Sequence, residues 1–328
     1  MVRHTPAVRS ALTAAVVGVL TLAAGCGSAA GGGGTDDGTL ILDFTPNAVH
    51  AGIYTALARD FDGGEGLRLR VRAPSSSTDS VRLLQTGRAD LAILDIADLA
   101  LARQEGRDVV AVMALVQKPL AAVIAQRDVR TPKALEGRRA GVAGLPSDTA
   151  VIRSVVKGAG GDPDRVEQVT IGFNAVPALL SRRVAAATAF WNAEGVALRK
   201  RGGPGRFREF RVDEYGAPAY PELVLCVTRE TLDEERDLVD KTIVALRRGY
   251  DEALKDPELA AETLVRRNRG LDRELVLDEL RALGSAFTAG AARFGELDRT
   301  RLTAWAKWAE EFGLVREAPA VEKAFLLG

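Results

Sequence analysis

The chain has 328 residues, with 44 Lys or Arg against 44 Asp or Glu, so its formal net charge is zero. A balance of this kind argues against nucleic acid as a partner. Two histidines and two cysteines are too few for a Cys- or His-rich metal site, and we predict neither a metal nor a cofactor.

The first 25 residues predict a lipoprotein signal peptide. Basic residues precede an apolar stretch at 11–24, and the sequence LAAGC then ends at Cys26. Cys26 is the predicted lipidation site, and the glycine-rich segment 26–38 is predicted to be a flexible tether. We therefore expect a protein that is lipid-anchored at the extracytoplasmic face of the cell membrane. An uncleaved anchor or a chance cysteine is the alternative.

The folded part of the chain offers few groups for catalysis. After removal of the signal, His50 is the only histidine and Cys226 the only cysteine besides Cys26, so no intramolecular disulfide is expected. A Ser-His-Asp triad would depend on His50, yet no Gly-x-Ser-x-Gly turn is present. We therefore predict a binding protein and not an enzyme.

Short apolar segments typical of strands alternate with segments of helical periodicity from residue 39 onward. This alternation predicts an α/β fold with a doubly wound parallel sheet. We expect strands at 40–42, 67–71, 90–94, 109–116 and 120–125. We expect one helix to begin at Asn47 and two others to cover 78–86 and 96–104.

A second series of the same kind predicts a second α/β lobe over residues 128–221. The expected strands are 139–142, 166–171 and 185–189, and the expected helices are 147–157, 176–181 and 193–201.

The last part of the chain has one strand, 222–227, followed only by helices. The expected helices are 232–254, 257–266, 272–283 and 298–312. Because these helices have no sheet of their own, we expect the chain to return to the first lobe, which then comprises 39–127 and 222–328. Two strands, 120–126 and 222–228, would cross between the lobes and form a hinge. We expect the protein to be a monomer, which suits a cleft that must open.

We expect the ligand between the lobes, at the carboxyl ends of strands where helices begin. The first such junction carries Asp43, Phe44, Asn47 and His50. Pro46 cannot continue a central strand and Asn47 can cap the helix that follows. The alternative for His50 is a packing role on the helix.

Two further junctions belong to the same lobe. Ser75 and Ser76 follow a strand and precede a helix, where hydroxyls and free N–H groups suit an anionic or carbonyl group. Asp95 and Asp98 follow the strand at 90–94. Simple helix capping is the alternative for the serines, and an acid in the first helical turn is the alternative for Asp98.

In the second lobe, Trp191, Asn192 and Glu194 lie where a strand ends and a helix begins. Trp191 offers a flat face for a planar ring, and Glu194 can accept two N–H bonds from an amino-heterocycle. The alternative places Trp191 in the core and Glu194 at the helix dipole. Tyr215 and Tyr220 precede the return to the first lobe and could form a cleft wall or pack within their loop.

The segments LDFTPNAVHAGIYTALARDF, WNAEGVALRKRG and VDEYGAPAYPELVLCVT, in this order, resemble the substrate-binding lipoproteins of ABC importers in the thiamine-pyrimidine-precursor group. The resemblance implies a two-lobed periplasmic-binding-protein type II fold that closes on a planar amino-heterocycle and delivers it to permease subunits. It implies that Phe44 and Asn47 contact the ring, Trp191 stacks on it and Glu194 holds the amino-pyrimidine edge. This group usually has Trp in place of Phe44 and a Ser-Tyr pair in place of Leu94-Asp95.

Related binding proteins take riboflavin, sulfonates or nitrate, which are the alternative ligands. The resemblance also extends to enzymes that make the pyrimidine from a lysine-bound pyridoxal cofactor and a histidine, with a cysteine cluster nearby. Leu94 and Asp98 stand at the lysine and histidine positions, and only Cys226 remains of the cluster. The enzymatic alternative is therefore disfavoured.

Overall fold

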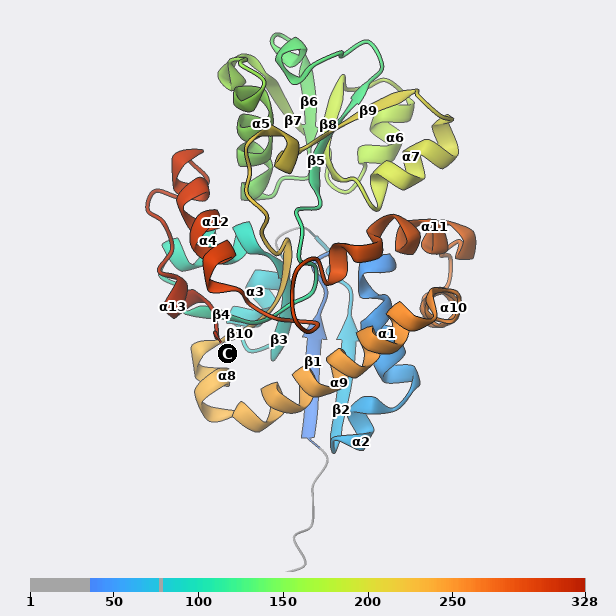
Figure 1. Ribbon diagram of the computed structural model, residues 1–328, viewed down its shortest axis with the longest axis vertical. Helices are drawn as coiled ribbons and strands as arrows, with labels where there is room; N and C mark the ends of the chain where they lie inside the picture. The colour runs from blue at the N-terminus through green and yellow to red at the C-terminus, as the bar shows by residue number, and fades with distance from the viewer. Residues whose placement is uncertain (1–35, 77–78, 328) are drawn as a thin grey trace, which may run out of the picture. The chain divides into compact units, whose positions relative to one another are not determined.

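The computed structural model describes residues 36–76 and 79–327, all within one compact unit of the chain, Gly34–Gly328. The predicted signal peptide and the lipidation site Cys26 lie outside the described residues. No helix in the described part of the chain is long and apolar enough to cross a membrane. The described residues form two five-stranded sheets with helices packed against them, which make up two lobes (Figure 1).

The first sheet has the strand order β2-β1-β3-β10-β4. β1 is parallel to β2 and β3, whereas β10 runs antiparallel to both of its neighbours, β3 and β4. The strands are β1 (Asp36–Ile41), β2 (Leu67–Arg72), β3 (Leu91–Asp95), β4 (Val109–Ala114) and β10 (Leu223–Thr228).

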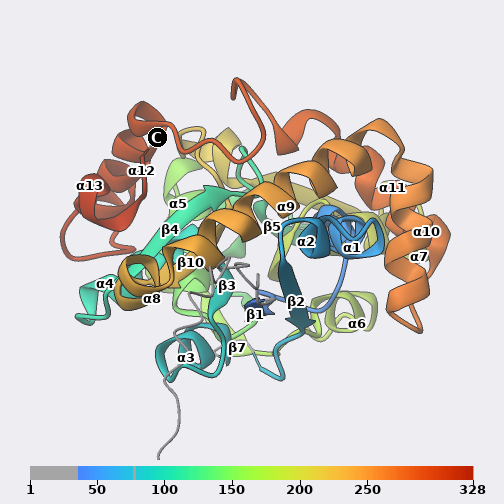
Figure 2. The ribbon, with the colours of Figure 1, turned by 90° about the horizontal axis from the view of Figure 1, so that it is seen from below.

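Helices cover both faces of this sheet because successive strand residues point to opposite sides. Leu40 packs in the cluster formed by α1 (Ala51–Ala58) and α9 (Arg236–Lys255), and Ile41 packs in the cluster formed by α3 (Asp79–Gln85) and α4 (Ile96–Gln104). Seen from below, α1 and α9 lie on one side of the strands and α3 on the other (Figure 2).

α1 and α9 cross at two glycines. A Cβ on Gly249 would lie 2.2 Å from the carbonyl oxygen of Gly52, and a Cβ on Gly52 would lie 2.2 Å from the Tyr250 ring. The Tyr250 hydroxyl donates a hydrogen bond to the Val49 carbonyl over 2.7 Å. This close crossing holds the start of α1, and with it the chain that follows β1, against α9.

The second sheet has the order β7-β6-β8-β5-β9. β6 is parallel to β7 and β8, and β5 is antiparallel to β8 and β9. The strands are β5 (Ala121–Gln126), β6 (Arg139–Val142), β7 (Glu167–Thr170), β8 (Ala186–Phe190) and β9 (Phe207–Arg211), and the helices of this lobe are α5 (Pro146–Gly158), α6 (Ala175–Leu180) and α7 (Glu194–Gly202).

The predicted lobe boundary at residue 127 is wrong by one strand. β5 lies in the second sheet between β8 and β9, so the first of the two segments of the first lobe ends with β4 at Ala114, and the chain crosses at 115–120. The return crossing, 216–222, ends before β10 begins. An apolar run that is buried on both faces fits the centre of either sheet, and its periodicity does not indicate which one.

The predicted tether also ends too late, because residues 36–38 belong to β1. Asp36 and Gly38 pair with Leu67 and Leu69 of β2, and Lys241 forms an ion pair with Asp36 over 2.7 Å. Pairing with β2 orders this polar start of the strand, although it has few apolar side chains of its own.

The predicted helix at 232–254 is two helices, α8 (Arg229–Glu234) and α9, with Glu235 in a non-helical conformation between them. Acidic residues are unfavourable at the end of one helix and favourable at the start of the next, which explains the break.

The remaining helices complete the two lobes. They are α2 (Phe61–Gly64), α10 (Pro257–Arg267), α11 (Arg273–Leu283), α12 (Arg299–Glu311) and α13 (Val321–Ala324), together with the 3-10 helices η1 (Ala48–His50), η2 (Pro132–Leu135), η3 (Pro163–Arg165), η4 (Val212–Tyr215) and η5 (Gly284–Phe287).

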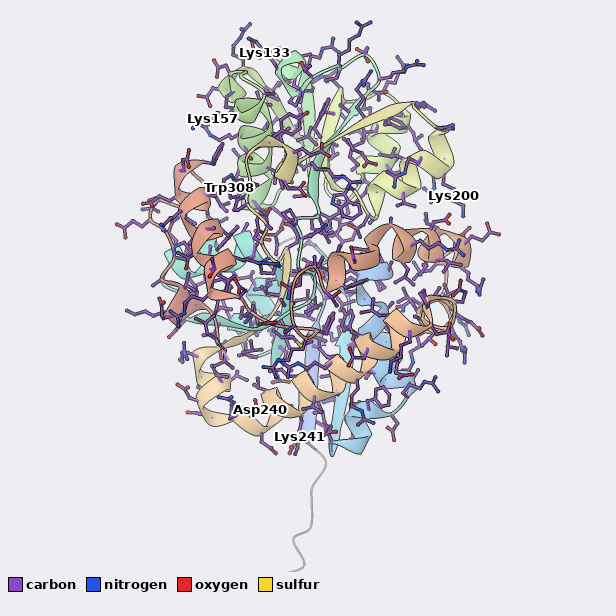
Figure 3. The ribbon with its side chains drawn as sticks, viewed as in Figure 1. Lys133, Lys157, Lys200, Asp240, Lys241 and Trp308 are labelled. Atoms are coloured by element: carbon purple, nitrogen blue, oxygen red, sulfur yellow. The ribbon has the colours of Figure 1, made fainter. Side chains whose placement is uncertain are left out.

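Two lysines of the second lobe reach helices of the first (Figure 3). Lys200 of α7 lies within 4 Å of three carboxylates on or beside α11, those of Asp272, Glu274 and Asp278. Lys157 of α5 lies 4.8 Å from the centre of the Phe312 ring, at the end of α12. The lobes are therefore in contact through side chains on two separate helices.

Candidate functional site

A cavity lies between the two sheets, at the carboxyl ends of β1, β3, β6 and β8. Its empty volume is about 920 Å³, part of which is open to solvent. Parallel strands leave exposed main-chain groups and helix N-termini at this edge, which is where ligands bind in open α/β sheets. Of the predicted site residues, those that line the cavity are Asp43, Phe44, Asp95, Asp98 and Glu194.

Three phenylalanines contribute to the apolar lining of the cavity. Phe44 follows β1 in the first lobe and Phe173 follows β7 in the second, and their ring centroids are 4.2 Å apart in an edge-to-face arrangement. Phe190, the last residue of β8, lines the same space. Aromatic side chains from both lobes thus border one cavity, and Phe44 and Phe173 touch each other across it.

Asp43 is held by His50. Nδ1 of His50 accepts a hydrogen bond from the Asn47 amide over 3.2 Å, and Nε2 lies 2.8 Å from Oδ1 of Asp43. A nitrogen that accepts an N–H bond carries no proton, so the imidazole is neutral and Nε2 donates to Asp43. His50 is fully buried and does not line the cavity. The side chain of His50 therefore lies behind Asp43 and not at the cavity, where a ligand contact was predicted.

Asn47 caps η1 through its side-chain oxygen, which accepts a bond from the Val49 amide over 3.0 Å. The nitrogen of its side-chain amide donates a hydrogen bond to the Thr45 carbonyl over 3.1 Å. Because both ends of the amide bind the neighbouring backbone, Asn47 shapes the turn after β1 and is not among the lining residues.

Asp95 and Asp98 bring two carboxyls to the cavity from the start of α4. Asp95 accepts a bond from the Ala97 amide over 2.7 Å, whereas Oδ1 of Asp98 is buried and has no hydrogen-bond partner among the described residues. Burial raises the pKa of Asp95 to about 6. Burial, together with repulsion from Asp95 and Asp148, raises the pKa of Asp98 well above its ordinary value.

Asp148 is a lining residue that the sequence did not single out. It lies in the first turn of α5, where Oδ2 accepts bonds from the amides of Gly144 and Leu145, each over 2.9 Å, and Oδ1 accepts one from the Thr188 hydroxyl. Burial raises its pKa. The sequence did contain a pattern that could have indicated Asp148, because this residue follows a strand and opens a helix as Asp95 and Asp98 do.

Glu194 opens α7 and lines the cavity. Oε2 accepts a bond from the Phe190 amide over 3.1 Å. Burial raises the pKa of Glu194, and repulsion by Asp43 acts in the same direction. Glu194 thus lies at the cavity, as predicted, with Oε2 already bonded to the backbone.

Trp191 is 6% exposed and does not line the cavity. Its Nε1 donates to the Pro119 carbonyl over 3.0 Å, and the Arg211 guanidinium lies 4.2 Å from the ring centre. The face that was expected to stack on a ligand is covered by Arg211. Asn192 is fully buried and also lies outside the lining.

The predicted serine site is a helix cap. The amides of Ser75 and Ser76 donate to Oδ2 of Asp79, over 2.8 and 3.0 Å, so these N–H groups are already bonded. Neither serine lines the cavity, and Ser80, the second residue of α3, does so instead.

The two tyrosines pack against other aromatic side chains, Tyr215 half-buried and Tyr220 buried. Tyr215 meets the edge of Phe210 at a centroid distance of 6.0 Å, and Tyr220, which is 3% exposed, stacks on Trp308 at 5.9 Å. Neither lines the cavity.

The cavity is acidic. Five of its described lining residues carry carboxyls and none is Lys, Arg or His; the five are Asp43, Asp95, Asp98, Asp148 and Glu194. Glu222 lies close behind Asp95, and its Oε2 accepts bonds from the amides of Leu120 and Ala121. Burial and repulsion from Asp95 raise the pKa of Glu222 well above its ordinary value. One carboxyl thus joins the two segments that cross between the lobes.

Comparison with known proteins places the chain in a family. The NMT1/THI5-like family matches residues 47–260. A formylaminopyrimidine-binding protein of Halalkalibacterium halodurans is 30% identical over 229 residues, 69% of each chain. A 4-amino-5-hydroxymethyl-2-methylpyrimidine phosphate synthase of Legionella pneumophila is 25% identical over 231 residues, covering 69% of this chain and 72% of the synthase.

Solved structures confirm the predicted fold. The alkanesulfonate-binding protein SsuA from Xanthomonas axonopodis pv. citri, bound to MOPS, matches 90% of this chain and 99% of its own with a TM-score of 0.71 and 16% identity. The described residues therefore have the two-lobed α/β fold of periplasmic binding proteins, and the chain belongs to the NMT1/THI5-like family.

Proposed function

We propose that this protein is the substrate-binding component of an ABC importer. It binds an aminopyrimidine precursor of thiamine between its lobes and delivers it to permease subunits. We further propose that Cys26 carries a lipid that anchors the protein at the extracytoplasmic face of the membrane. The observation that carries the proposal is the buried carboxyl of Glu194 in a cavity bordered by Phe44, Phe173 and Phe190.

These groups match the two properties of an aminopyrimidine. Its flat ring gains from contact with aromatic faces, by about 0.5 to 1.5 kcal/mol beyond area burial. Its exocyclic amine and ring nitrogens can meet a carboxyl, and a hydrogen bond to a charged group contributes about 1.5 to 3 kcal/mol. The family relative named for formylaminopyrimidine binding supports the same ligand class.

The charge of the cavity disfavours the small anions. A sulfonate or nitrate needs cationic or N–H donors, but the described lining residues provide five carboxyls and no basic side chain. The sulfonate-binding neighbour supports the fold and not this ligand. Riboflavin is also planar and is therefore the alternative ligand.

The synthase alternative requires an amine to form an imine with a pyridoxal cofactor. The described lining contains no lysine, and Cys226 is completely buried within the first sheet. We therefore propose binding and not synthesis.

Isothermal titration of the purified chain with 4-amino-2-methylpyrimidines, riboflavin, an alkanesulfonate and nitrate tests the proposal. We expect a pyrimidine to bind and the anions not to bind. Binding by an anion alone, or by riboflavin alone, would overturn the pyrimidine assignment.

Glu194→Gln provides the matching variant test. Loss of the charge should weaken pyrimidine binding by about tenfold or more, from the value of a charged hydrogen bond. Glu167→Gln, an exposed change in the same lobe, is the control and should leave the affinity unchanged.

A further inference from the structure

Phe44 and Phe173 contact each other across the boundary between the lobes. Phe44 follows β1 of the first lobe and Phe173 follows β7 of the second, and their ring centroids are 4.2 Å apart with an interplanar angle of 67°. Both rings line the cavity and both are half-buried. Each is followed by an exposed residue, Thr45 and Asn174 respectively. The pair therefore lies where the cavity meets solvent.

The spacing of these two rings leaves no room for a third ring between them. Carbon atoms in contact lie about 3.5 to 4.0 Å apart, so a planar ring stacked between two others needs about 7 to 8 Å between its neighbours. The observed separation of 4.2 Å is that of direct contact. A bound pyrimidine therefore cannot lie between Phe44 and Phe173 while the lobes are arranged as they are in this structure.

Other contacts between the lobes hold them in this arrangement. Nζ of Lys200 lies 3.4 to 3.7 Å from carboxylates on or beside α11, and Lys157 lies 4.8 Å from the centre of the Phe312 ring. The two lysines are on opposite sides of the molecule (Figure 3). The contact between Phe44 and Phe173 thus belongs to an arrangement in which the lobes already meet on both sides of the cavity.

Short turns with fixed backbones carry both rings. Nδ2 of Asn174 donates a hydrogen bond to the Ile171 carbonyl over 2.9 Å, across the turn that contains Phe173. Gly172 in the same turn has a φ of 58°, a conformation that favours glycine. The turn after β1 is fixed in turn by the side-chain hydrogen bonds of Asn47. Each ring should therefore move with its own lobe.

Phe190 is the aromatic side chain that remains for the ligand ring. It is the last residue of β8 and lines the same cavity. Its amide donates a hydrogen bond to Oε2 of Glu194 over 3.1 Å, so Phe190 and Glu194 are neighbours. A ring whose amine meets the Glu194 carboxyl therefore lies close to the Phe190 side chain.

We infer that Phe44 and Phe173 form a gate between the lobes, which closes on the solvent side of the bound ring, and that Phe190 provides the aromatic contact with that ring. This inference rests on the proposed function, because the amine of the pyrimidine places the ring at Glu194. Since its two members come from different lobes, the gate forms only when the lobes close. It slows the release of the ligand and leaves entry into the open cleft unhindered.

Stopped-flow binding of 4-amino-5-hydroxymethyl-2-methylpyrimidine to the purified chain tests the gate. Phe173→Ala should speed ligand dissociation by about two- to tenfold, from the value of an aromatic pair, and leave the association rate constant unchanged. Phe173→Leu keeps most of the side-chain volume without an aromatic face, so its dissociation rate should stay within about twofold of the wild type. Phe207→Leu changes a half-buried phenylalanine of the same lobe outside the cavity and is the control.

Phe190→Leu separates the gate from the ring contact. It removes the aromatic face beside Glu194 and should weaken the affinity by about two- to tenfold, whereas Phe173→Leu should not. A ring stacked between Phe44 and Phe173 would give the opposite order, and a loss in Phe173→Leu equal to or larger than that in Phe190→Leu would overturn the inference. Circular dichroism shows whether each variant is folded.

A crystal structure of the wild-type chain with the same pyrimidine gives a test that needs no variant. We expect the centroids of Phe44 and Phe173 to remain within about 7 Å, the range of aromatic pairs, with the ligand ring beside Phe190. A pyrimidine between Phe44 and Phe173 would overturn the gate and leave the proposed function standing. Failure of the wild-type chain to bind any pyrimidine would overturn the proposed function, on which the gate depends.

Discussion

Nε2 of His50 lies 2.8 Å from Oδ1 of Asp43, and the imidazole is completely buried. The opposite ring nitrogen accepts the Asn47 amide, so the ring orientation is fixed from both sides. Asp43 therefore presents its carboxylate to the cavity in one direction. The predicted ligand residue His50 acts through its neighbour.

His50→Ala should lower the free energy of unfolding by about 1 to 3 kcal/mol, because it leaves an oxygen of Asp43 without its donor. Combined with Asp43→Ala in a double-mutant cycle, the two changes should be less than additive, since both remove the same bond. Urea denaturation measures each value. Fully additive effects would mean that the bond contributes nothing.

Gly52→Ala should destabilise the protein strongly, because the new methyl group would overlap the Tyr250 ring at 2.2 Å in a rigid helix crossing. Overpacking of this kind costs about 1 to 3 kcal/mol or more. Gly64→Ala is the control, since its nearest neighbour is 3.9 Å away. Thermal unfolding should show a large decrease for the first variant and little change for the second.

Lys200→Gln should weaken ligand binding by a factor of about two to five at low salt, because Lys200 joins α7 to carboxylates beside α11 across the lobes. The effect should shrink as salt is added. Lys241→Gln removes the same charge from ion pairs within the first lobe (Figure 3) and should leave affinity unaltered. Equal losses for both variants would indicate a general charge effect.

Glu279 predicts a dependence of stability on pH. Burial raises its pKa from 4.5 to about 7, so the folded state holds the proton more tightly than the unfolded state. The stability that this tighter proton binding gives the folded state is therefore fully present below pH 4.5 and is lost as pH rises through about 7. Glu279→Gln should stabilise the protein at pH 8 relative to the wild type by up to about 3 kcal/mol, and much less at pH 5. Thermal unfolding at both pH values measures this difference, and an equal effect at both would contradict it.

The strand ends were predictable from the sequence, and so were the residues that follow them directly. Phe44, Asp95 and Glu194 come within a few positions of an apolar run and line the cavity. The side-chain directions of residues slightly further from the strand ends were not predictable. They depend on which face of the sheet each residue points to and on which neighbours it packs against. Trp191 turns toward Pro119 and Arg211 for this reason.

Contacts between distant segments were the other part that the sequence could not supply. β5 and β10 have similar apolar runs, yet one joins the second sheet and the other the first. The strand β9 was missed because its sequence, FREFR, is mostly charged, and only its pairing with β5 makes it a strand.

The position of β10 between β3 and β4 has a consequence for biogenesis. All five strands of the second sheet lie in one continuous segment, Ala121–Arg211, whereas the first sheet has a gap until Leu223–Thr228 has been synthesised. As a chain emerges from its N-terminus, the second lobe can be finished while the first still exposes the unpaired edges of β3 and β4. The sheet that contains β1 is thus the last of the two that can be completed.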